Sequence, residues 1–427
     1  MTTAIWCCGG ECGLLATATT NVGQHILVNA LSVGPWSVST TTVRNGARAL
    51  RYAPSAQNVI VLCIGTNAAV TTKVWRVAVR FATLPDVDCF ISSYGYSTTQ
   101  AGLGFQASDS TLRSLVSLAG VKTFGSSGTT ITTGVWYVVD VKTVGNVVTG
   151  TVDVQVDGSA VAQVAGAFAA ANTDTSLQLA GLGSITADIF YDDIVLSETA
   201  GDYPLGNGYV YAYVPTSDGT HNVASAGDFD RTLTGTDITN STTDAYLLVD
   251  TVPFIATDIS ADTCITITAP PNATDYVQCV FGPAPGSSTA VDTVHGVEIL
   301  GALQTASAGG SPTMDISLRI NDGGTTGDIF TSSVFYNPST PIFKRAHFAT
   351  APSSGTAWTA TKVNALEARF GSFDAADSAP DGYFGTIMAE VAFISVTVTP
   401  EQKNWIRTGH VQNMYGVRPG RIFGRSW

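Results

Sequence analysis

Apolar residues recur at every second position in many short stretches of the chain. The clearest case, 134–164, has one apolar set on each of two predicted strands: Tyr137, Val139 and Val141, then Val152, Val154 and Val156. Asp157-Gly158 follows the second set directly and is a strong signal for a tight hairpin turn. A period of two predicts strands with one buried face.

Predicted strands follow one another at intervals of roughly 8–15 residues, separated by Gly, Asn, Asp and Ser, which is typical of antiparallel sandwiches and jelly rolls. Helical periodicity is nearly absent. One short helix is predicted at 399–409, where Thr399 can cap the first turn, Pro400 occupies its first position and Gln402 lies three residues after the cap. The sequence therefore predicts an all-β protein.

The strand series is interrupted at ETAGDYPLGNGY (198–209), which is rich in glycine. The chain of 427 residues is also too long for one ordinary core. We therefore predict two tandem antiparallel β-sandwich (jelly-roll) domains, 1–200 and 205–398, followed by a C-terminal arm, 399–427.

The arm 399–427 differs in composition from the rest of the chain, with several arginines and aromatic residues and a single acid, Glu401. Arginine and aromatic side chains are the ones that most often anchor protein interfaces. A basic arm on an acidic protein favours docking to an acidic neighbour, such as another copy; the other interpretation is that the arm folds back on its own sandwich. The predicted interface residues are Trp405, Arg407, Tyr415, Arg418, Arg421, Phe423, Arg425 and Trp427.

Charged residues make up only 12% of the chain, so Thr, Ser, Asn and Gly must supply much of the polar surface. The 33 acidic and 20 basic residues give a net charge of −13, which disfavours nucleic acid and anionic membranes as partners. No stretch approaches the length that spans a bilayer, and the first residues lack a secretory pattern. We expect synthesis in a cytoplasm and no nucleic-acid or membrane partner.

Seven cysteines leave at least one unpaired within the chain. Cys7, Cys8 and Cys12 lie close together, but three candidate ligands without a second Cys or His motif do not make a zinc site. A first strand that carries thiols is favoured over a local disulfide, and the pairing of these three residues stays open. Cys63 and Cys279 lie in apolar runs and are predicted to be buried.

The most tempting carboxylates are Asp192 and Asp193, which could bind calcium, with Asp202 as a further ligand, or serve as acid and base. Adjacent strand residues point to opposite faces, so we favour a structural strand near a sheet edge. Glutamates and histidines are scattered, and no phosphate loop or serine nucleophile motif occurs. We predict no catalytic residue, no metal site and no cofactor.

Exposed aromatic rings are candidates for stacking on sugars. The segment 92–102 is predicted to be a loop, and Tyr94 and Tyr96 are its possible glycan contacts. A second set shares one strand face: Tyr209, Tyr211 and Tyr213. For this set we rank a core face above a subunit interface, and a glycan platform last.

Several phrases carry a resemblance to a known class of protein: IWCCGGE, RNGARALRYAP, YDDIVLSE and LGNGYVYAYVPTSDGTHN, then TDYVQCVFGP, NALEARFGS and YFGTIMAEVAF. Over about 1–398 the chain resembles virion structural proteins of tailed bacteriophages, which begin with a concanavalin-A-like, laminin-G-like β-sandwich. The resemblance makes the opening segment a first strand.

The resemblance implies a non-enzymatic component of the virion, in the head decoration, neck, collar or tail, assembled in the host cytoplasm. Its partners would be its own copies, in rings or trimers, and other virion proteins. The alternative is a lectin-like, carbohydrate-binding module for host-surface attachment, because the same fold serves both roles. A third interpretation, a glycan-degrading enzyme, requires two carboxylates that face each other across a cleft.

Overall fold

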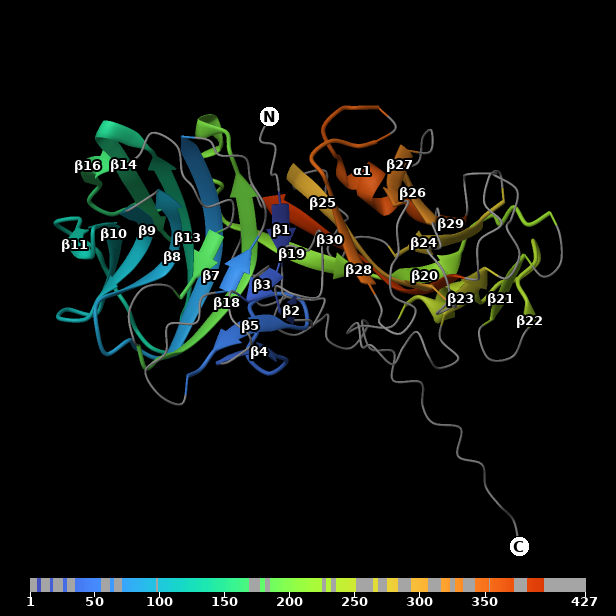
Figure 1. Ribbon diagram of the computed structural model, residues 1–427, viewed down its shortest axis with the longest axis horizontal. Coiled ribbons are helices and arrows are strands. Elements are labelled where there is room, and N and C mark those ends of the chain that lie inside the picture. Colours follow the sequence, from blue (N-terminus) through green and yellow to red (C-terminus); the bar gives the residue numbers. More distant parts are fainter. Residues whose placement is uncertain are drawn as a thin grey trace, which may run out of the picture.

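The computed structural model describes residues 6–8, 16–17, 26–28, 35–54, 62–64, 71–96, 99–168, 177–180, 185–224, 228–231, 236–250, 264–267, 275–282, 293–305, 316–322, 327–332, 342–352, 354–371 and 382–394. Within these ranges nearly every regular element is a strand, so the predicted all-β class is confirmed. Figure 1 shows the strands gathered into two bodies side by side.

The first body is a sandwich of two sheets, each with nine described strands. One sheet has the order β15 (Ser159–Ala160), β14 (Asn146–Val156), β13 (Trp136–Val144), β7 (Thr72–Thr83), β18 (Asp188–Ser197), β5 (Ala49–Tyr52) and β4 (Trp36–Ser39), with β1 (Trp6–Cys8) on β18 and β16 (Val164–Phe168) on β14. The other has the order β11 (Val121–Phe124), β10 (Thr111–Leu118), β9 (Thr99–Gln106), β8 (Cys89–Tyr96), β17 (Leu177–Leu179), β6 (Leu62–Ile64), β3 (Ile26–Val28) and β2 (Ala16–Thr17), with β12 (Thr129–Thr130) on β10. Pairing is antiparallel except between β2 and β3.

The second body is a sandwich of a seven-stranded and a five-stranded sheet. The larger sheet has the order β22 (Thr236–Asp237), β21 (Phe229–Arg231), β23 (Ile265–Ile267), β30 (Gly382–Ile394), β25 (Thr293–Thr305) and β28 (Ile342–Phe348), with β19 (Gly208–Tyr213) on β30. The smaller has the order β20 (Pro215–Asp218), β24 (Val277–Phe281), β29 (Leu366–Gly371), β26 (Ile316–Asp322) and β27 (Gly327–Ser332).

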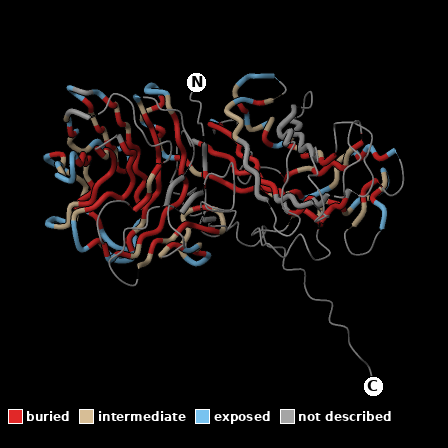
Figure 2. Tube along the Cα trace, in the orientation of Figure 1, coloured by how far each residue is buried: buried red, intermediate tan, exposed pale blue. Residues whose placement is uncertain are grey.

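The core of the first sandwich follows the predicted alternation. All six residues of the two sets in 134–164 are buried in one cluster with side chains of the facing sheet, such as Phe105. The turn after the second set forms as predicted, because Asp157 and Gly158 both take positive φ, 50° and 79°, and join β14 to β15. Figure 2 shows that the buried residues follow the strands.

The core of the second sandwich contains the tyrosine set of β19. Tyr211 and Tyr213 are buried in it, and Tyr209 stacks on Phe393 with ring centroids 5.2 Å apart. The set is therefore a core face, which was the first-ranked interpretation. Cys279 is buried in the same cluster, as predicted.

The cysteines whose side chains the structure describes are all buried: Cys8, Cys89, Cys264 and Cys279. The opening segment forms β1, as the resemblance implied. The side chain of Cys63, the whole of Cys12 and the predicted helix at 399–409 lie outside the described residues.

Short helical elements connect the strands of the second half. The α-helix α1 (Ala360–Asn364) was not predicted, although Thr359 caps it by accepting a hydrogen bond from the Lys362 N–H. Two 3₁₀ turns, η1 (Ala200–Asp202) and η2 (Ala245–Leu248), lie before β19 and after β22. None of the described helices is long and apolar enough to cross a membrane.

Candidate functional site

The two sandwiches meet in a packed junction. One apolar cluster joins Val74 and Val195 of the first sandwich to Val210 and Ala392 of the second, with Leu205 of the linker between them. Strand β1 pairs with β18 and also lies against β25 and β30. The chain therefore contributes both its first strand and its linker to the contact between the two halves (Figure 1).

Asp193 is the central polar group of this junction and is fully buried. One carboxylate oxygen accepts a hydrogen bond from the Val210 N–H at 2.6 Å, and the other forms an ion pair with Arg44 and accepts from the Asn45 amide. Arg44 also donates to the Gly208 carbonyl and to the Asn207 side chain, both at 2.8 Å. One carboxylate thus ties the first sandwich to the strand that opens the second.

Asp192 also holds residues 44–45, through their backbone. Its carboxylate accepts the backbone N–H groups of Arg44 and Asn45 at 2.8 and 3.2 Å, and that of Asp193 at 2.8 Å. The expectation that the two acids point to opposite faces is wrong. A bulge between Asp192 and Val195 and a positive φ of 51° at Asp193 turn both carboxylates onto residues 44–45.

The structural interpretation of this acidic pair agrees with these contacts, because the donors described above all belong to the protein itself. The predicted position near a sheet edge is wrong, because β18 lies inside its sheet between β7 and β5. Asp202, the suggested third ligand, instead accepts a hydrogen bond from Ser197. Across the described ranges no group of three or more His, Cys, Asp or Glu side chains is placed to hold a metal ion.

A second buried layer of charge holds the linker. Arg76 and Asp140 lie opposite each other on β7 and β13 and are 1% and 2% exposed. Arg76 donates to the Gly206 carbonyl, and Asp140 accepts from the Gly206 N–H, each at 3.2 Å. Burial raises the pKa of Asp140 to about 7, because the ionised form loses its solvation. Burial, aided by the charge of Arg76, lowers the pKa of His295 to about 4.

Two glutamates that are far apart in the sequence also meet near the junction. Glu298 of β25 and Glu390 of β30 are direct cross-strand partners and are fully buried, and Glu298 lies 2.9 Å from His347 Nδ1. Leu300 and Met388, two residues along the same strands, belong to the core cluster of the first sandwich. The sequence shows these glutamates as scattered, since their proximity depends on the β25–β30 register. Neither glutamate is accessible to solvent.

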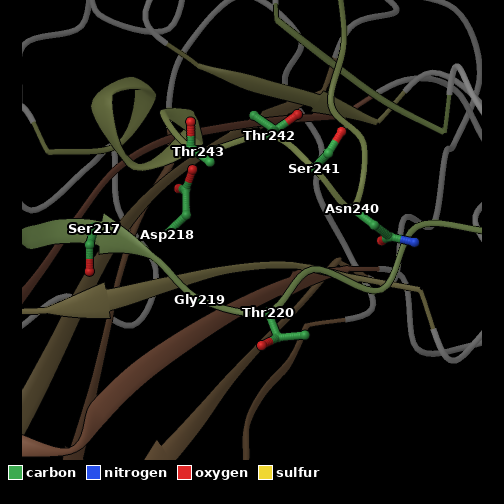
Figure 3. A pocket seen from close by; sticks show the side chains of 8 residues that line it. All are labelled: Ser217, Asp218, Gly219, Thr220, Asn240, Ser241, Thr242 and Thr243. Atoms are coloured by element: carbon green, nitrogen blue, oxygen red, sulfur yellow. The ribbon is translucent and has the colours of Figure 1, made fainter.

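A polar pocket lies in the second sandwich, away from these charges. It has a volume of about 420 Å³ and is lined by Ser217, Asp218, Gly219, Thr220, Asn240, Ser241, Thr242 and Thr243. Figure 3 shows segments 217–220 and 240–243 on opposite sides of it, with the Asp218 carboxylate directed toward Thr243. Sequence reasoning treated the SDGTHN phrase only as part of a resemblance and missed this pocket.

The glycan contact proposed at Tyr94 is wrong. Residues 89–96 form strand β8 rather than a loop, and Tyr94 is fully buried against Trp75, with ring centroids 5.2 Å apart. The side chain of Tyr96 lies outside the described residues. So do all the predicted interface residues of the arm: Trp405, Arg407, Tyr415, Arg418, Arg421, Phe423, Arg425 and Trp427.

Comparison with known proteins finds no matching family model and no matching curated protein. A domain of an extracellular arabinanase from Geobacillus stearothermophilus, solved with arabinotriose, is 15% identical, covers 46% of this chain and 93% of that one, and has a TM-score of 0.34. A carbohydrate-binding module from Bacillus subtilis is 9% identical, with 38% and 96% covered and a TM-score of 0.26. A sialidase from Trypanosoma rangeli is 11% identical over 43% of this chain, with a TM-score of 0.25, and the chain spans 33% of its length.

Proposed function

We propose that this protein is a non-enzymatic structural component of a tailed-phage virion. It acts through interfaces with its own copies and with other virion proteins. The proposal starts from the resemblance of the sequence, and one structural observation supports it further.

That observation is the junction. Three of the phrases that carry the resemblance, RNG (44–46), YDD (191–193) and GNGYV (206–210), contact one another there through Asp193, Arg44 and the Val210 N–H. This ion pair is expensive to separate, because the Asp193 carboxylate would lose its cation while still covered by protein. The contacts therefore favour a protein whose two sandwiches move as one stiff body, as a building block of a particle must.

The arm 399–427 is the proposed docking device. Its test is the solution mass of the full-length protein and of a chain that ends at residue 398, measured by light scattering after size exclusion. We expect a closed oligomer for the full chain, and a monomer with an unchanged β-type circular dichroism spectrum for the truncated one. Equal masses for the two folded chains would contradict docking through the arm.

A second variant tests whether docking depends on the positive charge of the arm or only on its presence. Replacing Arg418, Arg421 and Arg425 by Gln keeps the arm and removes much of its positive charge. If an acidic surface receives the arm, this variant should also be monomeric, and the wild-type oligomer should dissociate as salt is raised toward 1 M, where the Debye length is about 3 Å. An oligomer that is indifferent to both changes would show that charge does not guide docking.

Carbohydrate binding for host attachment is the second candidate function, and the polar pocket of the second sandwich favours it. Similarity at the TM-scores above transfers no ligand to this chain, so the pocket alone supports this candidate. The test is a glycan array probed with the labelled full-length protein. Saturable binding to a defined set of glycans is expected, and an array without signal at high micromolar protein would remove this candidate.

A further inference from the structure

We propose that the pocket between segments 217–220 and 240–243 binds a neutral, polyhydroxylated ligand, namely a saccharide without acidic groups. This inference rests on the carbohydrate-binding candidate, and it specifies the place and the chemical class of the ligand.

The lining of the pocket sets the class of ligand. Apart from Gly219, its described lining consists of Ser and Thr hydroxyls, the amide of Asn240 and the carboxylate of Asp218, and none of these lining residues is a Lys or Arg. An apolar ligand would cover these polar groups without pairing them, which is costly. An anionic ligand would meet the Asp218 carboxylate without a compensating cation. A ligand rich in hydroxyls avoids both penalties, because each hydroxyl donates and accepts. The volume of about 420 Å³ lies within the range of about 300–1,000 Å³ common for small-molecule sites.

Asp218 has the capacity to anchor such a ligand. Its two oxygens each accept one backbone N–H at the start of η2, from Tyr246 at 2.7 Å and Ala245 at 2.9 Å. An ionised carboxylate has about four acceptor positions, so about two remain for ligand hydroxyls. Its side chain is only 6% exposed, and hydrogen bonds to a charged acceptor in such a site are among the stronger ones.

His221 supplies an independent sign that polar chemistry at this place is incomplete. The residue is 4% exposed, and its Nδ1 accepts the Gln278 N–H at 3.0 Å, so a neutral ring carries its proton on Nε2. Within the described part of the chain that Nε2 has no hydrogen-bond partner, and it lies 3.7 Å from the Asp218 carboxylate, beyond hydrogen-bond range. Buried donors are normally paired. His221 is not among the described residues that line the pocket, so its Nε2 is a buried polar neighbour of Asp218 and not itself a ligand contact.

The two walls of the pocket are also fixed in place. Gly219 donates to the Gln278 carbonyl at 2.8 Å, and a side chain at this position would meet the Gln278 side chain at 2.5 Å. On the other wall, the Asn240 side chain accepts the Val223 N–H at 2.7 Å and donates to the Val223 carbonyl at 3.1 Å. A site that is already ordered loses less entropy when a ligand binds.

The experiment is a binding titration of the full-length protein in which ligand-detected NMR reports binding. Two panels of probes are used. One panel contains neutral mono- and disaccharides, and the other contains sialylated and sulfated saccharides of similar size. The pocket variant is T220V/T243V, which removes two exposed hydroxyls at nearly constant shape. The matched control is T123V, an exposed threonine on β11 of the first sandwich. Thermal melts of each variant report on folding.

We expect saturable binding of at least one neutral saccharide, weakened tenfold or more in T220V/T243V and unchanged in T123V, with no binding of the anionic panel. If the protein binds saccharides and T220V/T243V binds them as wild type does, the site assignment is overturned while carbohydrate binding survives. If anionic saccharides bind at this pocket, the proposed ligand class is overturned. If neither panel binds, the inference and the carbohydrate-binding candidate fail together.

Discussion

The junction and the pocket use the same chemical device with opposite outcomes. In each, an aspartate within or at the end of a strand accepts backbone N–H groups from another segment. Asp193 accepts the N–H of Val210, and Asp218 accepts those of Ala245 and Tyr246. At the junction, Arg44 and Asn45 occupy the rest of the Asp193 carboxylate, and the site is closed. At the pocket, the neighbour of Asp218 is a histidine that stays out of hydrogen-bond range. A saturated carboxylate stabilises a contact within the chain, whereas one with spare acceptor positions can bind a ligand.

The largest effect should follow from breaking the saturated site. Arg44→Ala leaves Asp193 buried and charged without its cation, so we expect a loss of about 3–5 kcal/mol in the free energy of unfolding, measured in urea. The matched control is Arg51→Ala, which breaks an ion pair with Asp188 whose arginine is 41% exposed and should cost no more than about 1 kcal/mol. Similar losses for both variants would mean that the junction is no stronger than a surface pair.

A smaller effect should follow from crowding the junction. A Cβ at Gly208 would lie 2.0 Å from Arg76 Nη1 and 2.1 Å from the Phe393 carbonyl oxygen, so Gly208→Ala must displace one or both. We expect a destabilisation of about 1–3 kcal/mol in the same assay. Gly166→Ala, where a Cβ meets nothing within 4 Å, is the control and should change stability by less than about 0.5 kcal/mol. A tolerated Gly208→Ala would show that β19 and β7 are not in close contact.

The buried Asp140 should make the stability of the protein depend on pH. Its pKa is raised to about 7 from 3.8, so the folded protein binds this proton more tightly than the unfolded chain does. Ionised Asp140 therefore destabilises the folded protein to its full extent above pH 7, and this destabilisation is lost as the pH falls toward 4. The stability of Asp140→Asn relative to wild type should rise with pH between 5 and 8, by at most about 1.4 kcal/mol per pH unit. A difference that is flat over this range would contradict the assignment.

His295 is present in both Asp140→Asn and wild type, so its contribution cancels when the stability of one is subtracted from that of the other. The pKa of that residue is lowered to about 4 from 6.5, so its stabilising effect is present above pH 6.5 and is lost as pH falls toward 4, opposite in sign to that of Asp140.

The smallest effect concerns thiol reactivity. Cys279 is fully buried in the core of the second sandwich, and burial raises the pKa of its thiol well above the usual value. We expect native Cys279 to resist thiol labelling and to react only under denaturing conditions, as read by mass spectrometry of peptides. Rapid native labelling of Cys279 would show that the second sandwich opens easily.

The regular part of the fold was accessible from the sequence, because strand alternation and the Asp157-Gly158 turn are local signals. The site was less accessible. Asp192 and Asp193 were recognised as structural, but their shared direction depends on a bulge that the alternation rule does not include. Arg44 begins the phrase RNGARALRYAP, but its partner Asp193 lies 149 positions away in the sequence. The meeting of Glu298 and Glu390 depends on strand register. The pocket depends on two segments that the second sandwich brings together, the end of β20 with the residues after it and the turn at 240–243. Tyr94 was misplaced because a strand rich in Ser, Gly and Tyr looks like a loop.

The central claim is that the junction joins the two sandwiches into one cooperative body, and calorimetry tests it most directly. We predict one heat-capacity transition for the wild-type chain, with equal calorimetric and van't Hoff enthalpies. Two independent transitions in the wild-type protein would contradict the claim, because each sandwich would then unfold without reference to the other.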